Sequence, residues 1–570
     1  MAPTRLSFLL FLTLMLTFTT MVWSQRPTPA PFQAGRSVTF STHGMVACAH
    51  PLAAQIGLDV LKQGGNAMDA AIAVNAALGL MEPTSCGIGG DLFAMVWDAK
   101  TQKLYGLNAS GRSPYKATRA YFLEKGLKAI PYKGPLSWSV PGCVDGWDQL
   151  RQRFGTWSFS QLLKPTIQYA EEGFPVTEVI AGYWRASERT LARSPEGAGI
   201  FLIQGRAPRA GTLFKNPLLA KSYREIAEHG RDGYYKGRIA QDIVAFSEKQ
   251  GGLFSLKDFE DHTSTWVEPV STNYRGYDVW ELPPNGQGIA ALQMLNMLEP
   301  YDLAKMGPKS ADYWHLFLES KKLAFADRAQ YYADPEFSKV PVQALISKPY
   351  AESRRKLIKM DQAAVGLSAG NPLIGQSDTT YLCVVDAQRN CVSLIQSNYA
   401  GFGSDYFPTG LGFGLQNRGT LFSLDEQHPN RLEPHKRPFH TIIPGFVTYQ
   451  GKPYFVFGVM GGDMQPQGHV QVLNNLIDFN MNVQAAGEAP RLEHLGSASP
   501  TGTAEEPQGG RVEYEIGLDP KIVQELTKRG HVMKEVRRNG GGYQGILIDP
   551  VTNVLKGGTE ARKDGMAIGY

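Results

Sequence analysis

Segments with helical spacing of apolar residues alternate along this chain with short apolar runs typical of β-strands, and this alternation constrains the fold most strongly. Helices are predicted over residues 51–63, 67–81, 313–334 and 352–360, and strands over 92–97, 104–107, 279–282, 381–385 and 392–395. No internal repeat accompanies the alternation. Strands grouped with helical layers on their faces predict a layered α+β sandwich.

The composition is that of a folded protein, and its 61 glycines favour a fold with many tight turns over a helical bundle. The chain has 570 residues, of which 43% are hydrophobic and 19% charged, so a disordered tail protein is excluded. The formal charge of +4 is spread without long runs, and no surface for nucleic acid is indicated. Length alone does not choose between about three domains and one large elaborated domain.

The amino terminus has the features of a secretory signal. An apolar stretch over residues 6–18 follows Arg5 and ends near small residues, which predicts removal of residues 1–24. A membrane anchor would need about 20 strongly apolar residues, and several threonines interrupt this run. The proline-rich stretch 25–32 is expected to be an extended tail. An exported protein, periplasmic or extracellular, without a stable membrane span is therefore predicted.

Five scattered cysteines do not form a disulfide framework in a chain of this size. Cys383 and Cys391 flank a predicted hairpin turn and could face each other, although buried thiols are the favoured interpretation. Neither zinc-type cysteine spacing nor an HExxH motif occurs, so neither a metal nor another cofactor is indicated.

Two glycine-containing motifs resemble catalytic signatures only in part. Residues 366–370 satisfy the GxSxG pattern, but Pro372 follows where a serine hydrolase needs a helix, which favours a linker over 363–377. The turn at 87–90 lacks the spacing of a nucleotide-binding loop. Its backbone is expected to approach either a ligand or another strand closely.

Thr379 and Thr380 stand where this linker meets the hydrophobic hairpin. Paired threonines are most often simply β-branched strand residues. A cut before one of them would, however, place a hydroxyl nucleophile and a free α-amine in the same residue. Because an α-amine has a pKa near 8, its neutral form could accept the hydroxyl proton.

Short motifs spread over the mature chain point to one family. They are GGNAMDAA (64–71), VPG (140–142), AFADR (324–328) with DP (334–335), TT (379–380) with VVD (384–386), FGS (402–404), KRP (436–438), GG (461–462) and the closing segment 564–570. Together and in this order they resemble the γ-glutamyltransferase, or glutathione hydrolase, family of the N-terminal nucleophile hydrolase superfamily.

The resemblance implies a four-layer αββα sandwich and a proenzyme that cuts itself between Asp378 and Thr379. Its fragments would span 25–378 and 379–570 and remain associated as a heterodimer with interleaved strands. It selects Thr379 as nucleophile and leaves Thr380 as the second candidate, with a structural role in the strand as the alternative. Ser397 would hydrogen-bond Thr379, at a position where the family usually has Thr. It also implies that the backbone N–H groups of Gly461 and Gly462 stabilise the oxyanion.

The implied substrate pocket departs from the family pattern. Arg112 is the candidate for gripping a substrate carboxylate, but its segment is shorter than usual, and an ion pair is the alternative. Where γ-glutamyl enzymes usually have Asn-Asn-Gln-x-Asp-Asp-Phe, residues 416–422 read QNRGTLF. Leu421 then replaces the Asp that binds the substrate α-ammonium, and Arg418 replaces the Gln.

Three more positions add to this departure. Tyr399 stands where Asn is usual, and His440 and Thr441 replace a common Ser-Ser pair. A cationic and apolar pocket favours an acyl group with a terminal carboxylate and no ammonium. The pattern is similar to the branch that contains cephalosporin or glutaryl acylase-like proteins and oxamate amidohydrolase.

Three hypotheses about function follow. The first is an amidohydrolase or acyltransferase that cleaves γ-glutamyl amides such as glutathione. The second is an acylase for dicarboxylic monoamides on the same fold, and the third is an uncleaved binding protein without catalysis. The physiological substrate and acceptor, the balance of hydrolysis and transfer, the efficiency of self-cleavage and the oligomeric state of the heterodimer are not encoded in any recognisable motif.

Overall fold

The computed structural model describes residues 34–367, 378–537 and 541–570. The predicted signal segment 1–24 and the tail 25–32 lie outside the described residues, as do residues 368–377 of the predicted linker, which include the serine of the GxSxG pattern. Among the described helices, none combines the length and the apolar character needed to cross a bilayer.

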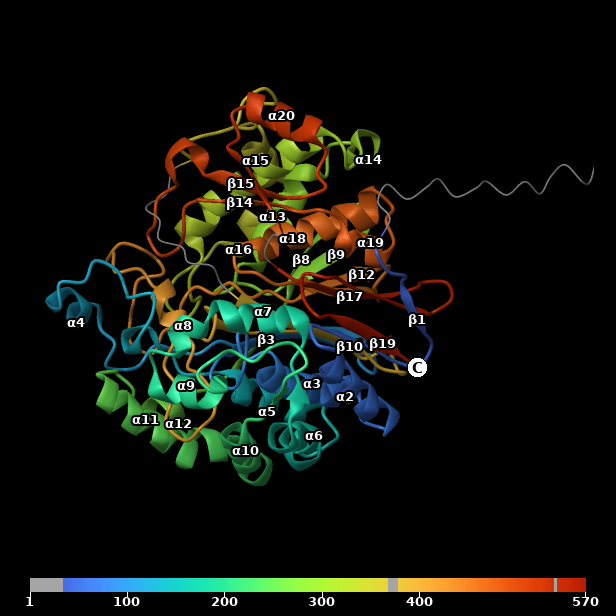
Figure 1. The fold of residues 1–570 in the computed structure, drawn as a ribbon. Coiled ribbons are helices and arrows are strands. Elements are labelled where there is room, and N and C mark those ends of the chain that lie inside the picture. The colour runs from blue at the N-terminus through green and yellow to red at the C-terminus, as the bar shows by residue number, and fades with distance from the viewer. Residues whose placement is uncertain (1–33, 368–377, 538–540) are drawn as a thin grey trace, which may run out of the picture.

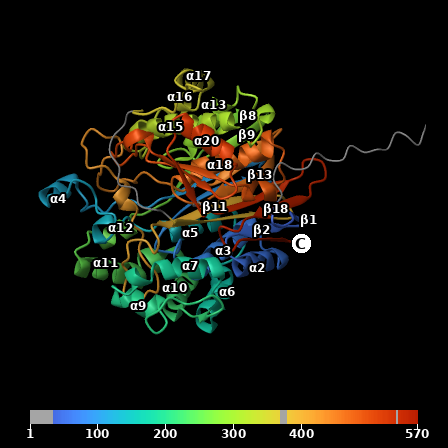
Figure 2. The ribbon, with the colours of Figure 1, turned by 45° about the horizontal axis from the view of Figure 1, so that its top comes forward.

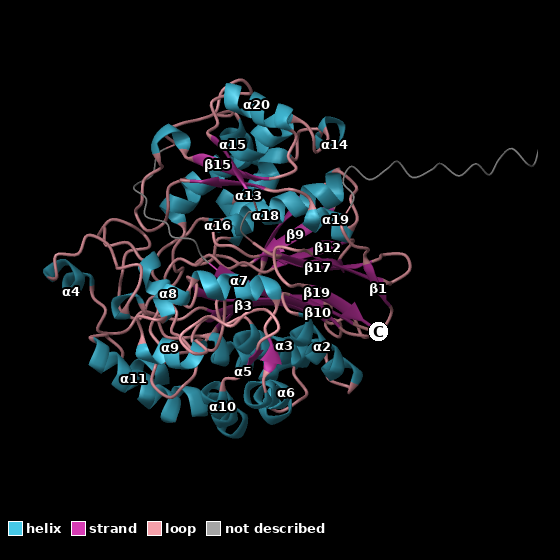
Figure 3. Ribbon diagram, in the orientation of Figure 1, coloured by secondary structure: helices cyan, strands magenta, loops and turns pink. Residues whose placement is uncertain are grey.

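Two seven-stranded antiparallel sheets stack face to face in the centre of the molecule (Figure 3). In order across the lower sheet the strands are β19 (Met566–Gly569), β2 (Met45–Cys48), β10 (Asp378–Val385), β11 (Cys391–Tyr399), β3 (Asp91–Asp98), β4 (Lys103–Ala109) and β7 (Thr265–Val267). Across the upper sheet they are β1 (Thr39–Ser41), β18 (Leu555–Thr559), β17 (Tyr543–Ile548), β13 (Lys452–Val459), β12 (Gly445–Tyr449), β9 (Tyr277–Glu281) and β8 (Val270–Tyr274).

Helices cover the outer face of each sheet (Figure 1). Below the lower sheet lie α2 (Pro51–Lys62), α3 (Ala67–Met81) and α5 (Cys143–Phe154), with α6 (Phe159–Glu172) and α10 (Pro217–Tyr235) outside them. Above the upper sheet lie α13 (Gly288–Leu298), α18 (Met464–Leu473) and α19 (Val483–Glu488), with α15 (Ala311–Tyr331) beyond. The turned view in Figure 2 keeps the two helical groups apart. The predicted αββα sandwich is confirmed.

Further helices and two small sheets lie outside the two central sheets. Further helices are α4 (Arg119–Glu124), α7 (Glu178–Ala186), α8 (Glu188–Leu191), α9 (Pro195–Phe201), α11 (Arg238–Gln250), α12 (Leu256–Glu260), α14 (Leu303–Met306), α16 (Val342–Leu345), α17 (Lys348–Arg355) and α20 (Pro520–Lys528). Small sheets are formed by β5 (Phe174–Pro175) with β6 (Leu213–Phe214), and by β14 (Leu492–Leu495), β15 (Arg511–Glu515) and β16 (Met533–Val536).

The α2–α3 pair shows how local sequence sets the lower layer. Asn66 caps α3 through a capping box with Asp69, which satisfies backbone donors at the helix start. Every residue of α3 is buried. A Cβ at Gly57 on α2 would lie 2.4 Å from Val74 Cγ2 on α3, so only glycine permits this close helix approach.

The β10–β11 hairpin confirms the two predicted strands but separates their cysteines. Cys383 pairs with Ser393, and Cys391 pairs with Val385. All five cysteines are free and buried, which agrees with the favoured interpretation of buried thiols. The helix predicted over 352–360 was misplaced, because α17 begins earlier, at Lys348, where Ser347 caps it, and ends at Arg355.

Both sheets combine strands from before and after residue 378. In the lower sheet β10 lies between β2 and β11, while β19 adds to the other side of β2. In the upper sheet β1, β8 and β9 flank the strands that follow residue 378. One core therefore contains both parts of the chain.

Candidate active site

Thr379 lies at the start of β10, at an irregularity in its pairing with β11. Asp378 is opposite Tyr399, whereas Thr380 is opposite Gln396, so the register shifts between them. Such a bulge re-aims a side chain locally. The buried Thr379 hydroxyl donates a hydrogen bond to Ser397 Oγ at 3.2 Å. The structure thus brings together the two hydroxyl groups that the sequence had paired.

The end of β11 turns sharply after Ser397. Ser397 Oγ also accepts a hydrogen bond from the backbone N–H of Tyr399 at 2.9 Å. Tyr399 has a φ of 73°, in the left-handed region that a bulky residue rarely adopts. Its ring lies beneath the guanidinium of Arg418, with 4.5 Å between the Arg418 Cζ and the ring centroid. Contacts therefore run from Thr379 through Ser397 and Tyr399 to Arg418, a residue of the predicted acyl pocket.

Arg418 is the most unusual cation of the site. It begins a short 3-10 helix, Arg418–Leu421, and is fully buried. Its Nη1 donates to Thr441 Oγ1 at 2.7 Å, while Nε and Nη2 have no hydrogen-bond partner within the described part of the chain. Burial lowers the pKa of Arg418 to about 10, partly opposed by Asp91 and Tyr399. A buried guanidinium with unmet donors is suited to bind an anion.

Leu421 closes the same short helix and contributes an apolar wall. Its side chain is buried and belongs to the same hydrophobic cluster as Tyr399 and Phe439. Leu421 and Arg418 thus stand at the two ends of one short 3-10 helix. A role of either residue in substrate binding stays a prediction.

His440 pairs with Asp91, a residue that the sequence analysis did not single out. His440 Nε2 lies 3.0 Å from Asp91 Oδ2, and both side chains are completely buried. Burial, aided by the charge of Arg418, lowers the pKa of His440 to about 4, so the neutral ring donates to the carboxylate. Asp91 begins β3 and pairs with Ser397 in the sheet. The Asp91 carboxylate is therefore on the strand next to Ser397.

Gly461 and Gly462 form the turn between β13 and the start of α18. Both have positive φ values, 109° and 57°, which explains why glycine is needed here. The amino-terminal end of a helix carries unpaired N–H groups and a partial positive charge. A turn of this kind could stabilise a developing oxyanion.

Gln287 connects the glycine turn to the acyl pocket. Its Nε2 donates to the carbonyl oxygens of Thr441 at 2.7 Å and Gly462 at 2.8 Å. Its Oε1 accepts from Arg328 Nη1 at 2.6 Å. Arg328 in turn pairs with Asp463 at 2.6 Å. Sequence reasoning missed this chain of contacts, because its members lie far apart in the sequence.

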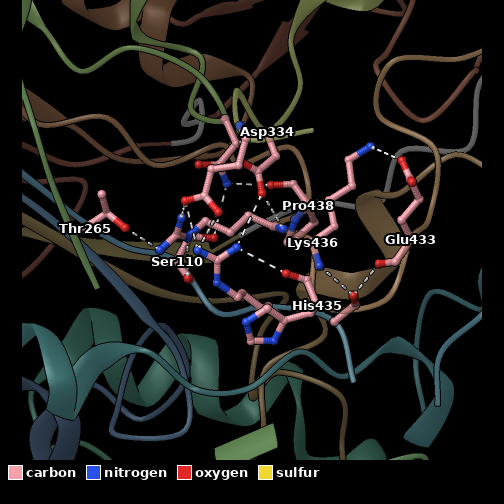
Figure 4. Close-up of polar contacts among 12 residues, drawn as sticks. Ser110, Thr265, Asp334, Glu433, His435, Lys436 and Pro438 are labelled. Atoms are coloured by element: carbon pink, nitrogen blue, oxygen red, sulfur yellow. Dashed lines mark hydrogen bonds and ion pairs between the residues drawn. The ribbon is translucent and has the colours of Figure 1, made fainter. Parts of the chain in front are cut away.

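Arg112 lies in a different network, which includes Asp334 and His435, both labelled in Figure 4. Its Nη2 is 2.9 Å from Glu336 and its Nη1 3.8 Å from Asp334, and Nη1 also donates to the His435 carbonyl. Arg437 joins the network through the same carboxylate of Glu336. These contacts favour the ion-pair alternative, in which Arg112 and Asp334 are buried while the Glu336 side chain is 47% exposed. A substrate role for Arg112 stays a prediction.

The glycine turn at 87–90 approaches a strand, the second of its two expected partners. The Gln396 side chain exchanges hydrogen bonds with the Gly87 N–H at 2.8 Å and the Gly87 carbonyl at 2.7 Å. A Cβ at Gly90 would lie 2.4 Å from the Ser397 carbonyl oxygen. The glycines thus permit close packing around the strand that carries Ser397.

One group of side chains has the composition of a metal site: His315, Glu319 and His531. However, His315 Nδ1 lies 2.9 Å from His531 Nε2, and Glu319 pairs with Lys322 at 3.0 Å. Its second oxygen accepts from the Ala364 N–H. Because these groups satisfy one another, the cluster is better described as a hydrogen-bond network of the upper helical layer.

Comparisons with known proteins point to one family. The family model described as gamma-glutamyltranspeptidase matches residues 53–570. The glutathione hydrolase-like YwrD proenzyme of Bacillus subtilis is 38% identical over 93% of this chain and 98% of its own length. The acylase ACY 1 proenzyme of Pseudomonas sp. strain SE83 is 33% identical over 95% and 96%. The crystal structure of cephalosporin acylase from Bacillus halodurans is 42% identical, covers 96% of this chain and 99% of its own, and superimposes with a TM-score of 0.86.

Proposed function

The chain belongs to the gamma-glutamyltranspeptidase family, and from this premise we propose that it is a proenzyme that cuts itself between Asp378 and Thr379. The observation that carries the proposal is the Thr379 hydroxyl, held 3.2 Å from Ser397 Oγ at the bulge of β10. The mature protein would comprise fragments 25–378 and 379–570, after export and removal of residues 1–24.

The proposed chemistry uses Thr379 twice. Its Oγ first attacks the Asp378 carbonyl carbon, the ester that forms is hydrolysed by water, and the α-amine of Thr379 is set free. The neutral amine then accepts the hydroxyl proton while Oγ attacks a substrate amide, and the amine leaving group departs as the acyl-enzyme forms. Water completes hydrolysis, and an amino acid or peptide amine completes transfer.

The supporting groups have distinct tasks in this mechanism. Ser397 would orient the Thr379 hydroxyl through their hydrogen bond. The N–H groups of Gly461 and Gly462 would receive the charge that develops on the substrate carbonyl oxygen, which rigid donors stabilise in the transition state. Arg328 and Asp463 would hold the glycine turn in place through their ion pair.

The acyl group of the substrate is the second part of the proposal. A γ-glutamyl amide carries an α-ammonium, and no acidic side chain stands at Leu421 to receive it. The unmet donors of the buried Arg418 favour instead a dicarboxylic monoamide whose free carboxylate pairs with the guanidinium. Tyr399 and Leu421 would bind the methylene groups. Glutathione-type γ-glutamyl amides and oxamate-type amides remain the alternatives on the same fold.

Thr379→Ala is expected to abolish both self-cleavage and activity, because the nucleophile of both reactions is lost. Intact mass spectrometry should give two fragments for the wild type, the smaller beginning at Thr379, and one chain for the variant. Thr527→Ala, on the exposed face of α20, is the control and should be cut normally. A Thr379→Ala protein that still splits would contradict the assignment. An uncut wild type would favour a binding protein.

Paired assays with γ-glutamyl and glutaryl anilides then address the acyl group. Faster turnover of the glutaryl anilide is expected from the charge of Arg418. A preference for the γ-glutamyl anilide would return the chain to the glutathione hydrolase class and would leave the nucleophile unaffected.

A further inference from the structure

Another buried ion pair, Glu82 with Lys563, contacts the strand that carries the two threonines. Glu82, at the end of α3, is fully buried, and its Oε1 lies 2.5 Å from Lys563 Nζ. The same oxygen accepts from Ser85 Oγ at 2.9 Å. Its other oxygen, Oε2, accepts from Thr380 Oγ1 at 2.8 Å. One carboxylate thus joins the helical layer, the nucleophile strand and the carboxyl-terminal segment.

The two threonines contact different partners. Thr379 donates to Ser397 on the neighbouring strand, whereas Thr380 donates to Glu82. Glu82 follows α3, the helix that packs against β10, so the contact at Thr380 holds β10 from the side of the helical layer. A buried carboxylate is stabilised only when it is paired and hydrogen-bonded, and Lys563 and Ser85 provide both. The ammonium of Lys563 also lies 4.7 Å from the ring centroid of Tyr183.

We propose that Glu82 and Lys563 form a positioning pair that, through the Thr380 hydroxyl, holds Thr379 in its attacking position in the proenzyme and in the cut enzyme. This inference rests on the proposed function of Thr379. Glu82 would belong to the large fragment, while Thr380 and Lys563 would belong to the small fragment. Glu82 of the large fragment therefore contacts the small fragment at two places, Lys563 and Thr380, and Thr380 is one residue away from the new amino terminus.

The pair also sets the charge next to the proposed base. After cleavage, Glu82 would favour a protonated Thr379 amine and Lys563 would disfavour it, so together they nearly cancel. Other charges around the site already have partners: Asp91 with His440, Asp463 with Arg328, and Asp564 with the N–H groups of Val179 and Ile180. Arg418 and Lys321 are two further buried cations near these groups.

Opposite shifts of the pH profile test this arrangement. Glu82→Gln removes the negative charge, lowers the pKa of the Thr379 amine and moves the acidic limb of kcat/KM to lower pH. Lys563→Met removes the positive charge and moves that limb to higher pH. The double variant should lie near the wild type. A pair with a merely structural role would leave the limb unchanged in all three variants, which would overturn the proposal.

Thr380→Val tests the mechanical link and leaves the ion pair intact. The substitution keeps the shape of the side chain, and Glu82 retains its bonds to Lys563 and Ser85. We expect slower self-cleavage and a kcat about tenfold lower with KM within about twofold, as for a misplaced nucleophile. An unchanged kcat would overturn the positioning role, even if the Glu82 variants failed to fold.

The matched control is another buried pair, Glu319 and Lys322, whose side chains are 1% and 2% exposed. Glu319→Gln and Lys322→Met should lower the melting temperature without shifting the acidic limb. These experiments can contradict the positioning role of Glu82 and Lys563 without contradicting the proposed function of Thr379. A wild type whose small fragment begins at Thr379 establishes the nucleophile, whatever the Glu82 and Thr380 variants show.

Discussion

At the scale of single residues, the proposed acyl specificity depends on Arg418 and Leu421. They lie three positions apart on one short 3-10 helix, where residues with this spacing share a face. Arg418 carries a buried positive charge, and Leu421 adds no negative one. The proposed partner of Arg418 is therefore a substrate carboxylate rather than an ammonium group.

Leu421→Asp is expected to raise γ-glutamyl turnover relative to glutaryl turnover. The new carboxylate would offer a partner to the substrate α-ammonium and would compete with the substrate carboxylate for Arg418. A ratio of kcat/KM values changed by roughly tenfold would correspond to about 1.4 kcal/mol. Paired anilide assays measure the ratio directly.

Leu421→Asn is the control for this substitution, because Asn has the shape and polarity of Asp without its charge. Equal effects of the two variants would attribute the change to polarity or packing. If neither variant alters the ratio, Leu421 has no part in acyl specificity.

At the scale of elements, the nucleophile strand depends on a close contact between the two sheets. A Cβ at Gly458 on β13 would lie 2.5 Å from the ring of Tyr381 on β10. The Tyr381 hydroxyl lies 2.8 Å from Ser393 Oγ, which donates to the Gly445 carbonyl of the upper sheet at 2.9 Å. The absence of a side chain at Gly458 thus sets the distance between β13 and the strand that carries Thr379.

Gly458→Ala is expected to destabilise the fold by about 1–3 kcal/mol, the usual effect of overpacking a dense core. It should also slow self-cleavage, because the Tyr381 ring must move together with β10. Melting temperature and the rate of fragment formation are the measurements. Gly199→Ala is the control, because a Cβ there meets open space within α9. A Gly458→Ala protein as stable as that control would contradict the packing argument.

The elements were more predictable from the sequence than their contacts. Apolar periodicity located α2 and α3 nearly to the residue, and it placed β10 and β11, because local burial determines that pattern. The bulge at Thr379 was not predictable, because it depends on how β10 meets Tyr399 across the hairpin.

The candidate site divides in the same way. Thr379, Ser397 and the glycine turn were identified through motifs that resemble a family. Asp91 and Gln287 were missed, because each acts through partners more than a hundred residues away and neither stands in a recognisable pattern. Arg112 was recognised as a cation, but its acidic partners Asp334 and Glu336 could only be found in the folded chain.

At the scale of the whole molecule, buried histidines link stability to pH. Burial lowers the pKa values of His50 and His440 to about 4 and that of His469 to about 3. The unfolded chain, with histidine pKa values near 6.5, then binds more protons than the folded chain at mildly acidic pH. Each neutral histidine therefore costs stability as the pH falls from about 6.5 toward 4.

The melting temperature is expected to fall as the pH is lowered from about 6.5 to 4.5. Each such histidine contributes about 1.4 kcal/mol of lost stability per pH unit in this window. Glu493 acts in the opposite direction, because burial raises its pKa to about 8 and the folded chain takes up its proton first. His469→Gln, compared with the wild type, should reduce the slope. A melting temperature that is flat over the window would contradict the assignment of neutral buried histidines.

The mixing of strands from before and after residue 378 in each sheet has a consequence for the refolding of the cut enzyme. In the precursor, β2 and β10 are tethered, so their pairing is intramolecular, and a tether supplies an effective concentration of about millimolar. Once a single peptide bond is cut, the same pairing becomes an encounter between two molecules. A denatured enzyme would then refold at a rate that depends on its dilution. The precursor can fold from one chain, whereas the cut protein, once denatured, would have to refold from two separate chains.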